Sequence, residues 1–205
     1  MANGSGMILS VQKELGAFYD VATFPDTRIL DYLNEGQALL APDVTRTMTA
    51  LIPIDASDLF EATPSNFIRI NTILPDPNFS GTHRVPPFQI VDGQFYWLDR
   101  IPRPASQMLL IYEARFPPFA ADASAIVLPD PGPEGLVAFA SMRCLQRLIG
   151  DRSAYRRYAT QTGSNVVQPE DLERLAEVWH QRYLQTREVL AQRIAIAAAE
   201  TVAQF

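Results

Sequence analysis

The side chains that most often carry out catalysis are scarce in this sequence and lie far apart. His83 and His180 are the only histidines, and Cys144 is the only cysteine. Neither histidine belongs to a metal-binding spacing such as HExxH, and a single cysteine cannot build a zinc site. Cys144 and His180 could pair as nucleophile and base. However, Cys144 lies in an amphipathic segment, where a buried and inert thiol is the favoured interpretation.

The glycines and the acidic residues also lack the patterns of the common enzyme classes. The ten glycines form no GxGxxG, GxxxxGK[ST] or GxSxG motif. The 23 acidic residues would allow a carboxylate pair of the kind that glycosidases use, but no spacing singles one out. Solvated surface acids are the simpler interpretation. The sequence therefore predicts no catalytic residue, no cofactor and no metal site.

A group of arginines with two tyrosines is the one basic feature. Arg152, Arg156 and Arg157 stand beside Tyr155 and Tyr158. Such a group is compatible with contact to nucleic acid, but the whole chain has a formal net charge of −6. A solvated helix face that pairs with nearby acids is the interpretation we prefer.

The composition is that of an ordinary globular protein. The chain has 205 residues, of which 47% are hydrophobic and 20% charged, enough for one good core with a protruding element. One cysteine allows no intrachain disulfide, which favours a reducing compartment. We find neither a signal-peptide pattern nor the run of about 18 apolar residues that a membrane span needs. We expect a soluble protein that is made in the cytoplasm.

The periodicity of the apolar residues changes twice along the chain and predicts the α+β class. We expect a helical bundle with a long C-terminal helix and an antiparallel β-sheet or hairpin region in the middle of the chain. A single domain is expected over 1–205. Its zones are N-terminal helices (1–45), a β-rich region (46–119), a proline-rich loop (120–133) and C-terminal helices (134–205).

The helices are bounded by capping residues, glycines and prolines. The last helix is expected to start near Pro169 and to run past Val202, a length of about 50 Å, which is more than the domain needs to cover itself. Part of its face is therefore expected to contact a partner subunit. The other predicted helices cover 8–20, 26–41 with Asn34 and Gln37 beside its apolar stripe, a segment from Pro133-Glu134 to Gly150, and a short one that Asp151 caps.

Alternation with a period of two predicts five strands. The turn Asp92-Gly93 marks a hairpin, because type I′ turns need positive φ at both central residues. After it come Phe95, Tyr96 and Trp97, which alternation places on both faces of the sheet. One face is expected to pack on the protein's own core and the other on a neighbour, a signal of assembly rather than of catalysis. The predicted strands are 46–54, 66–74, 87–91, 94–99 and 107–116.

The order of these pieces resembles the head-tail adaptor (connector or neck) proteins of tailed bacteriophages, including the tail tubular protein A type. The resemblance covers roughly 26–195, by order of elements more than by identity. It begins at the helix ILDYLNEGQALLA (29–41), with its Asn and Gln. It continues through the run VPPFQIVDGQFYWLDRIPRPASQMLLIYEARFPPF (85–119), a proline-rich loop, the Gly150-Asp151 step, the short helix with Tyr155 and Tyr158, and the long last helix.

The resemblance implies a structural role. An adaptor of this family forms a ring, usually of twelve copies, beneath the portal protein, in the neck of the virion. It docks the tail or nozzle protein and continues the channel through which DNA passes without sequence-specific binding. A ring closes through two different complementary patches. The aromatic hairpin is one candidate, and the distal end of the last helix is the other, with Ile194, Val202 and Phe205 reaching a neighbour or the portal.

Two alternatives remain open at this point. The same strands and helices would suit another structural protein of a phage tail or baseplate, which would differ only in the partner that it binds. A virion-associated hydrolase is the alternative from another class, and it would need two acids that face one cleft, one of them with a raised pKa.

Overall fold

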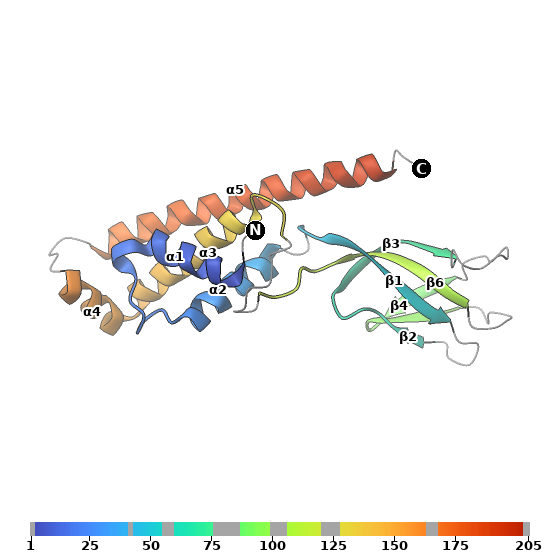
Figure 1. Cartoon of the computed structure of the whole chain (residues 1–205), viewed down its shortest axis with the longest axis horizontal. Helices are drawn as coiled ribbons and strands as arrows, with labels where there is room; N and C mark the ends of the chain where they lie inside the picture. Colours follow the sequence, from blue (N-terminus) through green and yellow to red (C-terminus); the bar gives the residue numbers. More distant parts are fainter. Residues whose placement is uncertain are drawn as a thin grey trace. The chain divides into compact units, whose positions relative to one another are not determined.

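The computed structural model describes residues 3–40, 43–54, 60–75, 87–98, 106–119, 128–162 and 168–202. It has the predicted α+β class, and the chain divides into two compact units. The helical unit comprises Met1–Val44 and Pro117–Phe205, and the β unit comprises Thr45–Phe116 (Figure 1). The β unit is thus inserted in the sequence between two halves of the helical unit.

Five α-helices form the helical unit, and four of them were predicted with nearly the observed bounds. The first begins earlier than the predicted 8–20 because the side chain of Asn3 accepts a hydrogen bond from Gly6 N at 2.7 Å and so caps it. It ends at Leu15 and is followed by a 3-10 turn, η1 (Gly16–Phe18). The α-helices are α1 (Gly4–Leu15), α2 (Asp26–Leu40), α3 (Gly132–Gly150), α4 (Arg152–Thr162) and α5 (Pro169–Val202).

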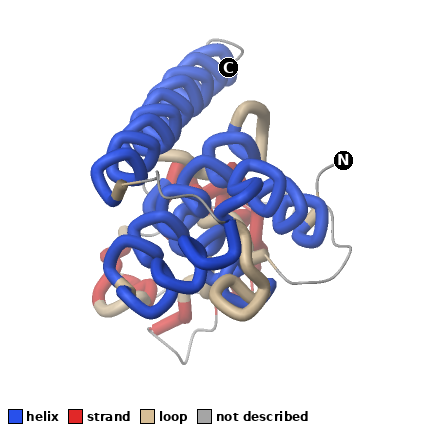
Figure 2. Tube along the Cα trace, turned by 90° about the vertical axis from the view of Figure 1, so that its left-hand side faces the viewer, coloured by secondary structure: helices blue, strands red, loops and turns tan. Residues whose placement is uncertain are grey.

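The centre of the helical unit is α3, which is buried around most of its circumference. It packs against α1, α2 and α5, and in Figure 2 the helix that leads to the C-terminus runs obliquely beside the other helices. The approach of α5 is close, since a Cβ on Gly135 would lie 2.4 Å from the side chain of Thr186. The ring of Tyr183 packs on Phe139 at 4.9 Å, and its hydroxyl donates to Gly36 O of α2 at 2.9 Å. The long helix is therefore fixed to α2 and α3 together.

The short helix α4 begins where the sequence predicts. Asp151 Oδ1 accepts hydrogen bonds from the backbone N–H groups of Ser153 (2.9 Å) and Ala154 (3.2 Å), which confirms it as the capping residue. These bonds satisfy backbone donors that have no partner within the helix. Among the described residues, no helix combines the length and the apolar character needed to cross a membrane.

The β unit contains two three-stranded antiparallel sheets. Five of the strands were predicted to within two residues at each end. The sixth, β2, was missed because three residues are too few to show a periodicity. Asp92 and Gly93 have φ of 50° and 74°, as the predicted hairpin turn requires. One sheet has the order β1 (Arg46–Ile54), β6 (Ser106–Ala114), β3 (Phe67–Pro75), and the other β2 (Phe60–Ala62), β5 (Gln94–Trp97), β4 (Phe88–Val91).

Aromatic side chains fill the core of the β unit. Phe95 and Trp97 stack with their ring centroids 5.9 Å apart, and Phe67 and Phe88 contact Phe95 from either side. The first sheet adds Leu110 and Tyr112 from the middle of β6 to the same cluster. In β1 the predicted alternation is confirmed: Met48, Ala50 and Ile52 face this core, and Thr47, Thr49 and Leu51 are exposed.

Two amide side chains of α2 hold the segment by which the chain returns to the helical unit. Asn34 accepts a hydrogen bond from Phe119 N at 2.7 Å and donates one to Phe119 O at 3.2 Å. One turn further along, Gln37 Nε2 donates to Pro117 O at 2.7 Å. The asparagine and glutamine that the sequence places beside the apolar stripe therefore bind backbone, and they fix the entry into the second half of this unit.

Candidate interaction surfaces

Among the described residues, the thiol of Cys144 and the imidazole of His180 are not brought together. Cys144 is completely buried, and this burial raises the pKa of its thiol to about 12, against the smaller opposite effect of the Arg28 charge. The thiol is therefore protonated and inert, as the sequence indicated. The imidazole of His180 lies 3.9 Å from the Glu177 carboxylate and is 43% exposed, while His83 lies outside the described residues. No group of metal-ligating side chains occurs in the described part of the chain.

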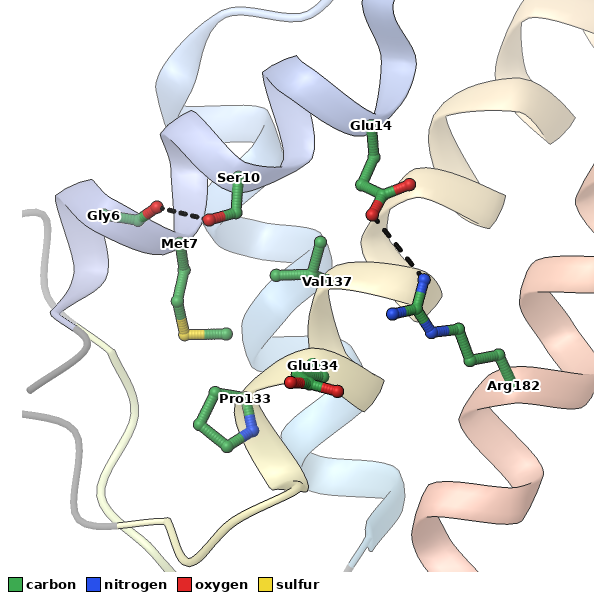
Figure 3. Close-up of a pocket in the computed structure, with 8 residues that line it drawn as sticks. All are labelled: Gly6, Met7, Ser10, Glu14, Pro133, Glu134, Val137 and Arg182. Atoms are coloured by element: carbon green, nitrogen blue, oxygen red, sulfur yellow. Dashed lines mark hydrogen bonds and ion pairs between the residues drawn. The ribbon is translucent and has the colours of Figure 1, made fainter.

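A cavity of about 420 Å³ opens between α1, α3 and α5 of the helical unit (Figure 3). Two carboxylates face it, but Glu14 is ion-paired with Arg182 at 3.6 Å, and Glu134 is exposed. The hydroxyl of Ser10 donates to Gly6 O at 2.9 Å. The cavity therefore lacks a nucleophile with its base. Its lining residues are Gly6, Met7, Ser10, Glu14, Pro133, Glu134, Val137 and Arg182.

A second, smaller depression of about 130 Å³ lies between α3 and α5, and we call it the α3–α5 depression. Two carboxylates stand on its α5 side. Glu177 accepts a hydrogen bond from Gln181 at 2.7 Å, whereas Glu173 has no ion pair or hydrogen bond with any residue that the structure describes. The depression is lined by Met142, Gln146, Ile149, Glu173, Ala176, Glu177 and His180.

The arginines of α4 divide between two sides of the helix. Arg157 donates to the hydroxyl of Thr23 at 3.3 Å. The hydroxyl of Thr23, and to a smaller extent the charge of Arg157, lower the pKa of Asp20, so this side is a polar contact within the unit. Arg152 and Arg156, one turn apart on α4, are exposed, and so is Arg157. Arg152 is not within ion-pair distance of any described carboxylate.

The tyrosines of α4 do not offer a stacking platform for bases. Tyr158 is only 8% exposed, and its ring lies 5.2 Å from that of Phe18. Tyr155 is half-buried. Because stacking on a base needs an open ring face, the basic and aromatic group does not have the arrangement of a single-strand binder.

The end of α5 extends beyond the helix against which it packs. Arg193 donates to Asp130 O, just before the start of α3, at 2.6 Å. The nine residues that follow in α5 therefore continue past the start of α3 by about 13 Å. Ile194 is half-buried and Ile196 is 59% exposed. Of the other predicted contact residues, Val202 is the last residue of α5, and Phe205 lies outside the described residues.

Of the three aromatic residues predicted as contacts, only one lies on the outer face of the hairpin, and Ile90 and Val91 of the same hairpin are also 40% and 49% exposed. Phe95 and Trp97 are 0% and 2% exposed, and both belong to the core of the β unit. Tyr96 points to the opposite face and is half-buried. The predicted alternation is therefore confirmed, and of these three aromatic residues Tyr96 alone remains a candidate for contact with a partner.

An exposed apolar row on the first sheet was not predicted from the sequence. Leu51, Leu109 and Leu74 are aligned across β1, β6 and β3, on the face that points away from the aromatic core. Leu51 is 50% exposed and Leu74 is 43% exposed. The signal was present in the alternation of 46–54, which places Leu51 outward. The cross-strand register that brings the three leucines together could not be deduced from it.

These surfaces are the α5 end, the α3–α5 depression, the α4 arginines, Tyr96 and the leucine row. They offer apolar and charged contact area, and no arrangement of described residues resembles a reaction centre. The chain matches no family model, and a search of curated proteins found no relative of significant similarity.

Proposed function

We propose that this protein is a head-to-tail adaptor of a tailed bacteriophage, which forms a ring beneath the portal and docks the tail. The observation that carries the proposal is the order of the elements. A helix with an asparagine and a glutamine is followed by an inserted β unit with an Asp-Gly hairpin. A proline-bearing return, a buried helix, an Asp-capped short helix and a very long last helix complete the chain. This is the order on which the resemblance to such adaptors rests.

The distribution of apolar surface supports an assembling protein. The leucine row leaves an apolar strip on the open face of the first sheet, and the exposed Ile196 lies where α5 has passed the start of α3. Exposed apolar surface of this kind commonly marks contact with another protein. The two features lie on different elements, and a heterologous contact, which closes into a ring, uses two different patches of each copy.

The proposal includes the portal, a tail or nozzle protein and further copies of the chain as partners, with DNA passing through the ring. A channel lined with basic side chains would hold phosphates through the release of counterions. With a net charge of −6, we expect the inner wall of the assembled ring to carry more acidic than basic residues. A charge map of the assembled ring tests this expectation, and a basic inner wall would contradict it.

Electron microscopy of the purified protein mixed with its portal tests the proposal. We expect a collar of the portal's symmetry, usually twelvefold, on the narrow end of the portal. No association with the portal, together with binding to a tail or baseplate protein, would replace the proposal by the second structural role.

The end of α5 is the expected portal contact, and truncation tests it. Removal of 195–205 should weaken portal binding while the far-ultraviolet circular dichroism loses only the signal of the deleted turns. Removal of 203–205 alone, which leaves α5 complete, is the matched control. Equal portal binding by the long truncation and the intact chain would show that the contact lies elsewhere.

A further inference from the structure

The α3–α5 depression has two kinds of lining that differ in chemistry. Its apolar part comes from Met142 and Ile149 of α3 and from Ala176 of α5. The carboxylates of Glu173 and Glu177, one turn apart on α5, stand beside this apolar part and are exposed to solvent. A volume of about 130 Å³ suits one side chain rather than a small-molecule substrate.

This combination fits an arginine side chain. The three methylene groups of an arginine can lie along apolar surface while its planar guanidinium binds carboxylates through several N–H donors. The helical unit contains one arginine in such an environment. Arg182 lines the larger cavity together with Met7 and Val137, and its guanidinium pairs with the carboxylate of Glu14. In the α3–α5 depression the carboxylate of Glu173 has no such cation among the described residues.

The chain itself presents the complementary group. Four arginines and one aspartate lie between 147 and 157, while four acids and one arginine lie between 170 and 177. Arg152 and Arg156 are exposed on one side of α4, and Arg152 has no carboxylate partner in the described part of the chain. The two segments are therefore opposite in charge.

We propose that the Arg152 side of α4 in one copy binds the α3–α5 depression of a second copy. When each copy binds one neighbour through its donor surface and another through its acceptor surface, the contact is heterologous and can close into a ring. This inference deepens the proposed function by naming one contact between copies, and it rests on that function only for the closure into a ring. The favoured occupant is a protein rather than DNA, because the acceptor carboxylates would repel phosphates.

A reciprocal charge exchange in the full-length chain tests the contact. Arg152→Glu alone and Glu173→Arg alone should each weaken self-association at low salt by roughly tenfold or more, since each replaces an attraction by a repulsion. Arg152→Glu mixed with Glu173→Arg should recover most of the affinity, because the variant surfaces are complementary. Sedimentation at low and high salt measures this, and high salt should reduce the difference between the intact chain and the single variants.

Two matched controls make the same charge changes elsewhere on the helical unit. Lys13→Glu on α1 and Glu188→Arg on α5 alter exposed residues that line neither surface. Both should associate like the intact chain. Thermal unfolding of every variant separates a lost contact from a lost fold.

Disulfide cross-linking tests the contact at the level of single residues. One copy with Arg156→Cys and another with Glu177→Cys, each one turn from the proposed Arg152–Glu173 pair, should form a mixed dimer under mild oxidation, and neither copy should cross-link with itself. The native Cys144 does not interfere because it is fully buried. This experiment needs no stable ring, so it also detects a weak contact.

The outcomes distinguish this proposal from the adaptor function. Absence of the cross-link together with no recovery in the mixture would overturn the proposed contact, even if the portal still binds. Loss of DNA binding in Arg152→Glu, with self-association unchanged, would overturn it in favour of a nucleic-acid surface. Recovery in the mixture without any portal binding would instead support the contact and remove the adaptor role.

Discussion

The helical unit and the β unit are stabilised in different ways. The helical unit is assembled from two distant pieces of chain around one central helix, and its core consists mainly of aliphatic side chains from α1, α2, α3 and α5. The β unit is one continuous segment, Thr45–Phe116, and a cluster of aromatic rings holds its two small sheets together. A continuous segment with its own core can open without taking the rest of the molecule with it. The helical unit has no such independence, because either half alone lacks its partner.

The largest expected effect is in the β unit. Phe95→Ala removes the ring at the centre of the aromatic cluster, and we expect a loss of about 3–5 kcal/mol in the free energy of unfolding. Near-ultraviolet circular dichroism should show the β unit unfolding at a much lower temperature. The helical signal in the far ultraviolet should unfold close to its original temperature. A single joint transition would mean that the two units are coupled more tightly than their separate cores indicate.

The corresponding change in the helical unit should affect both halves of the chain. Gly135→Ala places a methyl group where the side chain of Thr186 lies, so α3 and α5 must move apart. We expect a loss of about 1–3 kcal/mol, measured by urea unfolding of the helical signal. Gly150→Ala, at a position with open space, is the matched control and should have little effect.

A smaller loss of stability is expected where Asn34 of α2 binds the segment that leads back into the helical unit. Asn34→Ala removes two hydrogen bonds to the backbone of Phe119 and should cost about 1–2 kcal/mol. Hydrogen exchange should show faster exchange of the Phe119 amide, while the amides in the middle of β6 stay protected. An equal increase in the exchange rates of the β6 amides would show that these two hydrogen bonds also stabilise the β unit.

The smallest effect concerns the start of α4 and depends on pH. The hydroxyl of Ser153 and then the backbone N–H of Ala154 lower the pKa of Asp151. The cap therefore stabilises the folded state above the unfolded pKa of about 4, and this contribution is lost as the pH falls through the lower folded value. Asp151→Ala should remove this part of the acid dependence of stability. Asp151→Asn, which still caps but does not titrate, should keep the helix start without the pH dependence.

Local signals in the sequence predicted the elements, and contacts between distant residues decided the surfaces. Asp92-Gly93 and Pro169 mark a turn and a helix start through their own backbone preferences, so the hairpin and α5 were predicted correctly. The strand β2 was not, because its three residues are held only by pairing with β5. The α3–α5 depression also escaped prediction, since it depends on the register in which Ile149 meets Glu173 across two helices.

The insertion of the β unit has a consequence for synthesis on the ribosome. Roughly ninety residues separate the end of α2 from the start of α3, which at ordinary translation rates takes about 5–20 s. During this time α1 and α2 are complete, but Ile29 and Leu33 have no central helix to cover them. The β unit, with mostly local pairing of its own strands, can fold in that interval. The nascent chain thus carries a finished domain between two unfinished halves, and exposure of the early helices should make it a substrate for chaperones.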